Sequence, residues 1–277
     1  MVSRLQACGV NYKGITLDDG GIVVSHLRST LQELADQEIT PRYLYTVPTV
    51  QNPTGSVMPL ERRHEILDVV REFGVPIFED ECYADLTWGC ERPPSFRALD
   101  GGADNGGGGQ VIYCGSFSKS IAPALRVGYI IGDAPVIRQI QALKTDAGTG
   151  ALEQLTLAEY APAHFEAHVD QLIAALRAKS DAMVAAVKAS FGGEVEVTTP
   201  MGGIYVWLTF PEGVDTDEFA PAAAEEGIQF NPGSGWSADP EWGKRRMRLC
   251  FGAPDTTTIN EGVAALAQVY NTYREAN

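Results

Sequence analysis

Lys119 is the residue in this sequence whose type and position first suggest chemistry. It follows residues 111–114 (VIYC), an apolar run typical of a β-strand, and Gly115 is expected to end that strand. Open α/β sheets bind their ligands beyond the carboxyl ends of the strands. A lysine amine at such a position can form a Schiff base with a carbonyl compound, and a nearby cation such as Arg126 favours the neutral, reactive amine. Read alone, Lys119 is more simply an ordinary surface lysine after a strand. Other segments must therefore support a catalytic role for it.

Two more polar clusters follow predicted strands upstream of Lys119. Asn52 lies in a polar loop after the first strand, and Asp80 lies in the acidic cluster at 79–81 that follows the second. Strand, helix and strand in this order predict a parallel sheet with a right-handed crossover. Because the carboxyl ends of parallel strands share one edge, we expect Asn52, Asp80 and Lys119 to converge on one crevice. The elements concerned are a strand at 43–47, a helix at 60–73 and a strand at 75–78.

The hydrophobic pattern predicts an α/β chain with two domains. Residues 1–168 are expected to form a large domain with a mainly parallel sheet, and residues 169–277 a small α+β domain, with a long helix joining them. Residues 100–110 (DGGADNGGGGQ) indicate a flexible surface loop, because the lysine and hydroxyl of a phosphate-binding loop are missing.

The remaining elements are predicted from apolar periodicity and from helix-ending residues. In the large domain we expect strands at 10–17 and 126–131 and helices at 24–38 and 134–144. Between 152 and 191 the pattern indicates two helices, the second from 165 to 189. The small domain is expected to contain strands at 195–198, 204–209, 228–230 and 246–251 and helices at 217–226 and 257–273.

Charge and composition exclude several classes of partner. The chain of 277 residues carries a formal net charge of -15, which disfavours nucleic acids and anionic membranes as partners. Its five cysteines are odd in number and lack paired C-x-x-C spacing, so we expect reduced thiols. No apolar run follows Met1 or is long enough to span a bilayer, and a cytoplasmic location is therefore the expectation.

The polar clusters contain the functional groups that pyridoxal phosphate requires. That cofactor needs an amine for its aldehyde, an acid at its pyridine nitrogen, a donor for its phenolate oxygen, and hydroxyls or cations for its phosphate. Lys119 offers the amine, Asp80 the acid, and Tyr83 or Asn52 the donor. Arg248 alternates with apolar residues on a predicted strand, and its guanidinium suits a substrate carboxylate. Taken singly, each of these residues also suits a plain structural role.

Metal and hydrolase chemistry are less compatible with the sequence. His164 and His168 stand four residues apart, but the glutamate between them is misplaced for an H-E-x-x-H zinc motif, and we expect no metal. No G-x-S-x-G nucleophile elbow occurs, since the segment around Ser116 does not fit it.

Five ordered motifs resemble the class I and II aminotransferases of fold type I, which depend on pyridoxal phosphate. The resemblance extends over nearly the whole chain, and the number and order of the motifs make coincidence a poor explanation. The motifs are Asn52-Pro53-Thr54-Gly55, Asp80-Glu81-Cys82-Tyr83, Ser116-Phe117-Ser118-Lys119 with Arg126-Val127-Gly128-Tyr129, Pro200-Met201-Gly202-Gly203-Ile204-Tyr205, and Arg248-Leu249-Cys250-Phe251.

The resemblance implies a role for each matching residue and an activity for the chain. Lys119 would be the Schiff-base lysine and proton shuttle, and the chain would exchange an amino group between an amino acid and a 2-oxo acid in amino-acid metabolism. A homodimer is implied as well. The remaining implied roles are Asp80 at the pyridine nitrogen, Tyr83 and Asn52 at the phenolate oxygen, Ser116 and Arg126 at the phosphate with Ser118 beside them in the cofactor site, and Arg248 with Asn52 at the substrate carboxylate.

Three alternatives stay open at this point. A lyase of the same fold would act on a β- or γ-substituted amino acid with the same lysine. Family members also carry an N-terminal arm, early strands and a phosphate-binding helix start before the point that matches Met1, so we expect a sheet domain that is incomplete at its N-terminus. Such a chain could be a catalytically impaired or interacting protein rather than an enzyme. Finally, Trp236 is compatible with lining a substrate pocket and equally with packing as a loop aromatic.

Overall fold

The structure, a computed structural model, describes residues 5, 7–101, 109–146 and 148–276. Two compact units divide the chain. The large unit consists of Ile15–Gln51 and Ser56–Ile173, and the small unit of Met1–Gly14, Asn52–Gly55 and Ala174–Asn277. The predicted division into domains at 168/169 stays a prediction.

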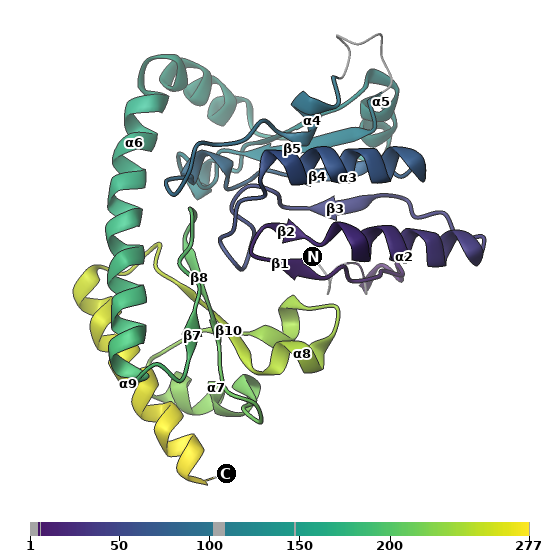
Figure 1. The fold of residues 1–277 in the computed structure, drawn as a ribbon. Helices are drawn as coiled ribbons and strands as arrows, with labels where there is room; N and C mark the ends of the chain where they lie inside the picture. Colours follow the sequence, from purple (N-terminus) through teal and green to yellow (C-terminus); the bar gives the residue numbers. More distant parts are fainter. Residues whose placement is uncertain (1–4, 6, 102–108, 147, 277) are drawn as a thin grey trace. The chain divides into compact units, whose positions relative to one another are not determined.

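A four-stranded sheet organises the large unit (Figure 1). Its order is β3-β4-β5-β6, with the first three strands parallel and β6 antiparallel to β5. Helix α3 (Leu60–Glu72) connects β3 to β4, which is the crossover that the sequence predicts. The strands are β3 (Leu44–Thr46), β4 (Ile77–Asp80), β5 (Val111–Ser116) and β6 (Gly128–Ile131).

The core of the large unit lies between one face of this sheet and two helices. Helix α2 (Val24–Asp36) contributes Leu27 and Leu31, and α3 contributes apolar residues at helical spacing that pack above Ile77 of β4. Alternate residues of β4 and β5 are buried on this face, while their neighbours are half-buried on the other. We call this second, half-buried face the open face of the sheet. It carries Phe78 and Asp80 of β4.

Several predicted elements of the large unit differ from the structure. The strand expected at 10–17 is wrong: a short hairpin of β1 (Leu17–Asp18) and β2 (Gly21–Ile22) forms instead, turning where Asp18 accepts a hydrogen bond from the Gly20 amide. Strand β5 also continues through Gly115, which pairs with Tyr129 of β6. The glycine-rich segment at 102–108 lies outside the described residues. The shorter elements are η1 (Ala84–Leu86), α4 (Phe96–Leu99), η3 (Pro123–Leu125) and α5 (Ala134–Leu143).

Helix α6 (Ala151–Ser190) is a single helix of 40 residues, so the prediction of two helices is wrong. Pro162 lies inside it, and a proline there removes one backbone hydrogen bond and bends a helix without necessarily ending it. Figure 1 shows the bend in the first half of α6. No helix in the described parts of the chain is long and apolar enough to cross a membrane.

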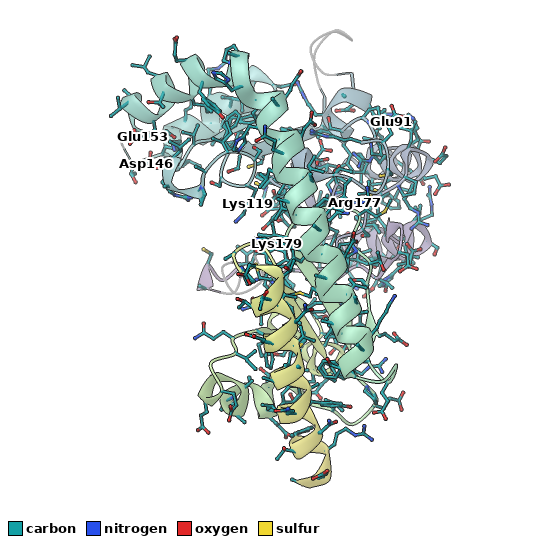
Figure 2. The ribbon with its side chains drawn as sticks, turned by 90° about the vertical axis from the view of Figure 1, so that its left-hand side faces the viewer. Glu91, Lys119, Asp146, Glu153, Arg177 and Lys179 are labelled. Atoms are coloured by element: carbon teal, nitrogen blue, oxygen red, sulfur yellow. The ribbon has the colours of Figure 1, made fainter. Side chains whose placement is uncertain are left out.

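The small unit contains an antiparallel sheet of order β7-β8-β10-β9. Phe191, Phe210 and Tyr270 pack together in its core. Lys179 of α6 donates to the Gly252 carbonyl just before the last helix (Figure 2). The strand predicted at 228–230 lies instead at β9 (Asn231–Pro232). The other elements are β7 (Glu196–Val197), β8 (Tyr205–Thr209), α7 (Thr216–Glu225), η4 (Gly233–Trp236), α8 (Pro240–Lys244), β10 (Arg246–Cys250) and α9 (Thr256–Ala276).

Candidate functional site

The turn after β5 brings Lys119 together with two hydroxyls and a guanidinium. The Ser118 amide donates to the Ser116 hydroxyl at 3.1 Å, and Arg126 Nη1 lies 3.4 Å from Ser118 Oγ. Arg126 has a left-handed backbone (φ 53°), which closes the turn between β5 and β6 and lets its side chain reach back to Ser118. Hydroxyls and a guanidinium on one turn form a donor set suited to a phosphate group.

Asp80 ends β4, the neighbouring strand, on the open face of the sheet. It stands opposite Cys114 in the parallel register, so it lies at the same edge as the Lys119 turn. Its Oδ2 accepts a hydrogen bond from Tyr45 Oη at 2.7 Å, and its Oδ1 accepts one from the Cys82 amide at 3.2 Å. Both carboxylate oxygens are therefore held in a fixed orientation.

Tyr83 follows Asp80 by three residues and lies beside Lys119. The Lys119 Nζ is 5.8 Å from the centre of the Tyr83 ring. The structure thus brings Asp80, Tyr83, Ser116 and Lys119 to the carboxyl ends of two adjacent strands, as parallel pairing predicts.

A buried network of charged side chains underlies this edge of the sheet. Arg63 of α3 is fully buried and donates to the carbonyls of Met58, Pro94 and Pro48. It also donates to Thr49 Oγ1 at 2.8 Å, and that hydroxyl donates to Glu81 Oε1 at 2.8 Å. Arg63 Nη1 lies 3.5 Å from Glu81 Oε1. Arg63 therefore ties the loop after β3, at Pro48 and Thr49, to the segment at Pro94.

Two buried carboxylates flank Asp80 in the sequence, and both point to the opposite side of the sheet. Glu79 accepts hydrogen bonds from the amides of Phe96 and Arg97, at the start of α4. Burial raises the pKa of Glu79. Burial and the charge of Glu79 together raise the pKa of Glu81 to about 8.

In the small unit, Arg248 of β10 is enclosed by two aromatic rings and two amides. Its guanidinium carbon lies 3.8 Å from the centre of the Tyr205 ring and 3.9 Å from that of Trp236. Nη1 donates to Asn52 Oδ1 at 2.9 Å, and Nη2 donates to Asn231 Oδ1 at 2.6 Å. The plane of the guanidinium is thereby fixed, which suits recognition of a planar carboxylate.

The loop that carries Asn52 has an unusual backbone on both sides. Val50 is buried and has a left-handed backbone (φ 58°), which is an outlier for a β-branched residue. Gly55 also has a positive φ of 73°, and a Cβ there would lie 2.4 Å from Pro200 Cβ. Asn52 and Pro53 are joined by a cis peptide bond. Only glycine satisfies both requirements at position 55.

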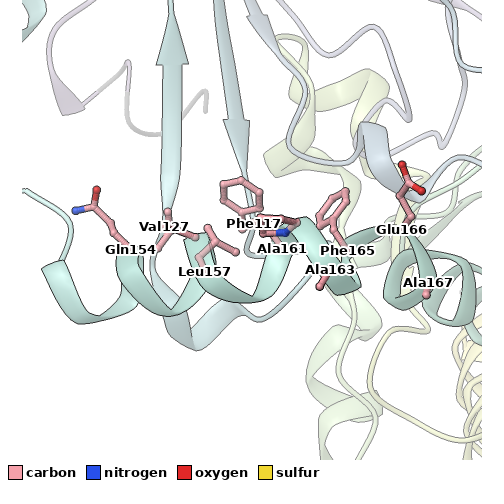
Figure 3. Close-up of a pocket in the computed structure, with 11 residues that line it drawn as sticks. Phe117, Val127, Gln154, Leu157, Ala161, Ala163, Phe165, Glu166 and Ala167 are labelled. Atoms are coloured by element: carbon pink, nitrogen blue, oxygen red, sulfur yellow. The ribbon is translucent and has the colours of Figure 1, made fainter.

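A cavity of about 810 Å³ lies between the end of β5 and the first half of α6 (Figure 3). Phe117 and Phe165 line it and meet edge to face, with ring centres 6.3 Å apart. Lys119 and the other predicted cofactor residues are not among the described residues that line it. His164 and His168 lie on the same helix, and no group of metal-ligating side chains is present in the described part of the chain.

The family comparison agrees with this geometry. The model of the family described as aminotransferase class I and II matches residues 3–266. The chain belongs to this family. It is 33% identical to the aromatic-amino-acid aminotransferase 1 of Thermococcus litoralis over 92% of this chain and 60% of the relative. It is 30% identical to YisV of Bacillus subtilis, named as an uncharacterized HTH-type transcriptional regulator, over 95% of this chain and 52% of the relative.

A solved structure supports the fold and the cofactor. LysN, an α-aminoadipate aminotransferase from Thermus thermophilus complexed with N-(5'-phosphopyridoxyl)-L-leucine, superposes with a TM-score of 0.88 at 31% identity, over 97% of this chain and 67% of that one. The predictions of a fold type I α/β architecture and of a pyridoxal-phosphate-dependent family are confirmed. The chain spans 60% of the length of the Thermococcus relative and 52% of the length of YisV.

The sequence reasoning missed several residues of this site. The sequence predicts Tyr45 only as part of a strand, although its position in the alternation places it on the same face as Phe78 and Asp80. Arg63 is a charged residue on the apolar face of α3, and this break in the pattern was its signal. Asn52 and Arg248 belong to the small unit, so the predicted convergence of all the clusters on one crevice stays a prediction.

Proposed function

We propose that this chain exchanges an amino group between an amino acid and a 2-oxo acid with pyridoxal phosphate, which Lys119 holds as a Schiff base. The observation that carries the proposal is the placement of Lys119 and Asp80 at the carboxyl ends of adjacent strands, with two hydroxyls and Arg126 on the lysine turn. An amine, an acid and phosphate donors are the groups that this cofactor requires.

The residues present fit the cofactor group by group. Ser116, Ser118 and Arg126 would hold the phosphate, and Asp80 would hold the pyridine nitrogen in its protonated form. Tyr83 and Asn52 would donate to the phenolate oxygen. When bound, the ring supplies an acceptor for the electrons left behind when the α-proton leaves the amino acid. The Lys119 amine would be the base that takes this proton and returns it.

Arg248 is proposed to bind the α-carboxylate of both substrates. Its flat, enclosed guanidinium supports bidentate capture of a carboxylate, and the amide of Asn52 at 2.9 Å helps to set its angle. The names of the relatives do not extend to this chain, and we assign the substrate class only as an amino acid and its 2-oxo acid partner.

Lys119→Ala tests the proposal directly. The wild-type protein incubated with pyridoxal phosphate and reduced with borohydride should carry the cofactor on the peptide that contains Lys119, as shown by mass spectrometry. Lys119→Ala should lose that label and at least about 10²-fold in turnover. Lys144→Ala, a surface lysine at the end of α5, is the matched control and should behave as wild type.

The outcomes of this experiment separate the open alternatives. Release of ammonia and a 2-oxo acid from one amino acid, without an acceptor, would replace the transfer reaction by a lyase reaction on the same lysine. A wild-type protein that carries no label after reduction would refute the role of Lys119.

We infer a second candidate function from the similarity to a named regulator. The match to YisV, which is named only as a transcriptional regulator, covers 95% of this chain and supports a regulatory role without catalysis. Labelling of Lys119 without turnover of any amino acid and 2-oxo acid pair would favour this function over catalysis.

A homodimer is proposed as the assembly. Exposed apolar residues support a protein interface: Tyr129, Ile130 and Ile131 on β6 are each at least 40% exposed, and Leu152 and Leu155 at the start of α6 are more so. Light scattering on the purified chain should give twice the mass of 29.8 kDa, and a single-chain mass would contradict the dimer. The cytoplasmic location stays a prediction.

A further inference from the structure

Tyr45 makes the shortest described hydrogen bond to Asp80. Its Oη lies 2.7 Å from Asp80 Oδ2, whereas the Cys82 amide lies 3.2 Å from Oδ1. Hydrogen bonds to a carboxylate are stronger than those between neutral groups. The orientation of the Asp80 side chain therefore depends in large part on one hydroxyl from the neighbouring strand.

The sheet register explains why this tyrosine reaches Asp80. Tyr45 of β3 stands opposite Phe78 of β4, and Asp80 is two residues further along β4. Residues two apart on a strand share a face, so Tyr45, Phe78 and Asp80 lie on the open face together. The Tyr45 ring packs on Phe78 with centres 6.1 Å apart, and this contact directs the hydroxyl toward the carboxylate.

Tyr45 remains a neutral donor over the working range of pH. Burial, and then the charge of Asp80, raise the pKa of Tyr45 well above its usual value. Its hydroxyl therefore keeps its proton and continues to donate to the Asp80 carboxylate.

The other titratable groups around Asp80 do not replace this hydroxyl. The Cys82 thiol makes hydrogen bonds to Asp80 and to the Cys114 thiol, but both cysteines are free thiols, and thiols are weak donors. Glu79 and Glu81 are engaged on the opposite side, at the start of α4 and with Thr49.

We propose that Tyr45 is a positioning residue that aims the Asp80 carboxylate at the pyridine nitrogen of the cofactor. This inference rests on the proposed function, because it assumes that pyridoxal phosphate binds with its ring nitrogen at Asp80. Tyr45 acts only through Asp80, and it touches neither the substrate nor the reacting atoms.

Binding of two cofactors to two variants tests this role. Tyr45→Phe removes the hydroxyl alone, and Tyr43→Phe is the matched control, since Tyr43 also packs on Phe78, at 5.9 Å. The two probes are pyridoxal phosphate and an analogue in which carbon replaces the ring nitrogen. Dissociation constants are measured by equilibrium dialysis, independently of turnover.

Tyr45→Phe should weaken the binding of pyridoxal phosphate by about 10-fold and leave the binding of the carbon analogue unchanged. Tyr43→Phe should change neither constant. In turnover, Tyr45→Phe should lower kcat more than it changes KM for the amino acid. A variant that weakens both probes equally has lost only packing, and this result would overturn the inference, as would unchanged binding of both. A wild-type protein that binds neither probe would instead overturn the proposed function, and the role of Tyr45 with it.

Discussion

The guanidinium of Arg248 lies over the ring of Trp236, with 3.9 Å between the guanidinium carbon and the ring centre. Trp236 belongs to the turn η4, and Arg248 belongs to β10. The ring centre of Tyr205 also lies 3.8 Å from that carbon, and both terminal nitrogens of Arg248 are hydrogen-bonded, so the arginine has little freedom to rotate.

Trp236→Leu should therefore weaken carboxylate binding while leaving the chemistry intact. Loss of one stacking ring frees the guanidinium, and we expect KM for the amino acid to rise by up to about 10-fold with little change in kcat. Trp242→Leu is the control, because Trp242 stacks on Arg246 at the other end of the same strand. Equal effects of the two variants in steady-state kinetics would contradict the role of Trp236.

Arg63→Met should destabilise the protein strongly. The substitution leaves Thr49 and three backbone carbonyls without their buried hydrogen-bond donor, at a cost of about 3–5 kcal/mol in the free energy of unfolding. Arg62→Met removes a neighbouring arginine whose ion pair with Asp18 is partly exposed, and it should cost at most about 1 kcal/mol. Urea denaturation measures both, and similar values would show that the buried network adds little.

Stability should fall as the pH rises from about 4.5 to about 8. The pKa of Glu81 is raised from its usual 4.5 to about 8, chiefly by burial, so the folded protein holds a proton that the unfolded chain releases in this range. The contribution of Glu81 is therefore complete below pH 4.5 and is lost by about pH 8, with a slope of up to about 1.4 kcal/mol per pH unit.

Glu81→Gln should flatten this dependence, because glutamine does not ionise. Urea denaturation at several pH values gives the slope, and Glu65→Gln on the exposed side of α3 is the control. A Glu81→Gln protein with the wild-type slope would show that another group causes the pH dependence.

Gly55→Ala should disturb the loop that holds Asn52. Gly74→Ala is the control variant. Its added Cβ meets no atom within 4 Å, so only the left-handed backbone at this position lowers the free energy of unfolding, by about 1 kcal/mol. At Gly55 the added Cβ also overlaps Pro200, so we expect about 1–3 kcal/mol more. Thermal unfolding compares the two variants, and equal losses would mean that Pro200 moves aside without cost.

The places of Asp80 and Lys119 in the sheet follow from the sequence more directly than the bounds of several helices and strands do. Asp80 and Lys119 could be located from sequence because each follows a strand of a parallel sheet, and parallel strands bring such residues to one edge. The enclosure of Arg248 by Tyr205 and Trp236 could not be predicted from sequence. It depends on how β8, η4 and β10 pack, and no local pattern encodes that packing.

The wrong element predictions have local physical causes. The pattern between 152 and 191 predicts two helices, but the residues on both sides of Pro162 form one continuous helix that tolerates one missing hydrogen bond. Gly115 suggested the end of a strand, whereas pairing with Tyr129 of β6 carries β5 on to Ser116. In both cases a residue that often ends an element lies inside one, because neighbouring structure supports it.

The left-handed backbone of Val50 narrows the choice of residues at that position. The flanking chain is held on both sides, by the pairing of Thr49 with Val57 and by the hydrogen bond from the Gln51 amide to the Ser56 carbonyl. Glycine would adopt this backbone easily but would leave the space of the buried valine side chain empty. Asparagine would also tolerate the backbone but would bury a polar amide among apolar atoms. Most substitutions of Val50 should therefore lower the stability of the loop that carries Asn52, although Val50 itself has no reactive group.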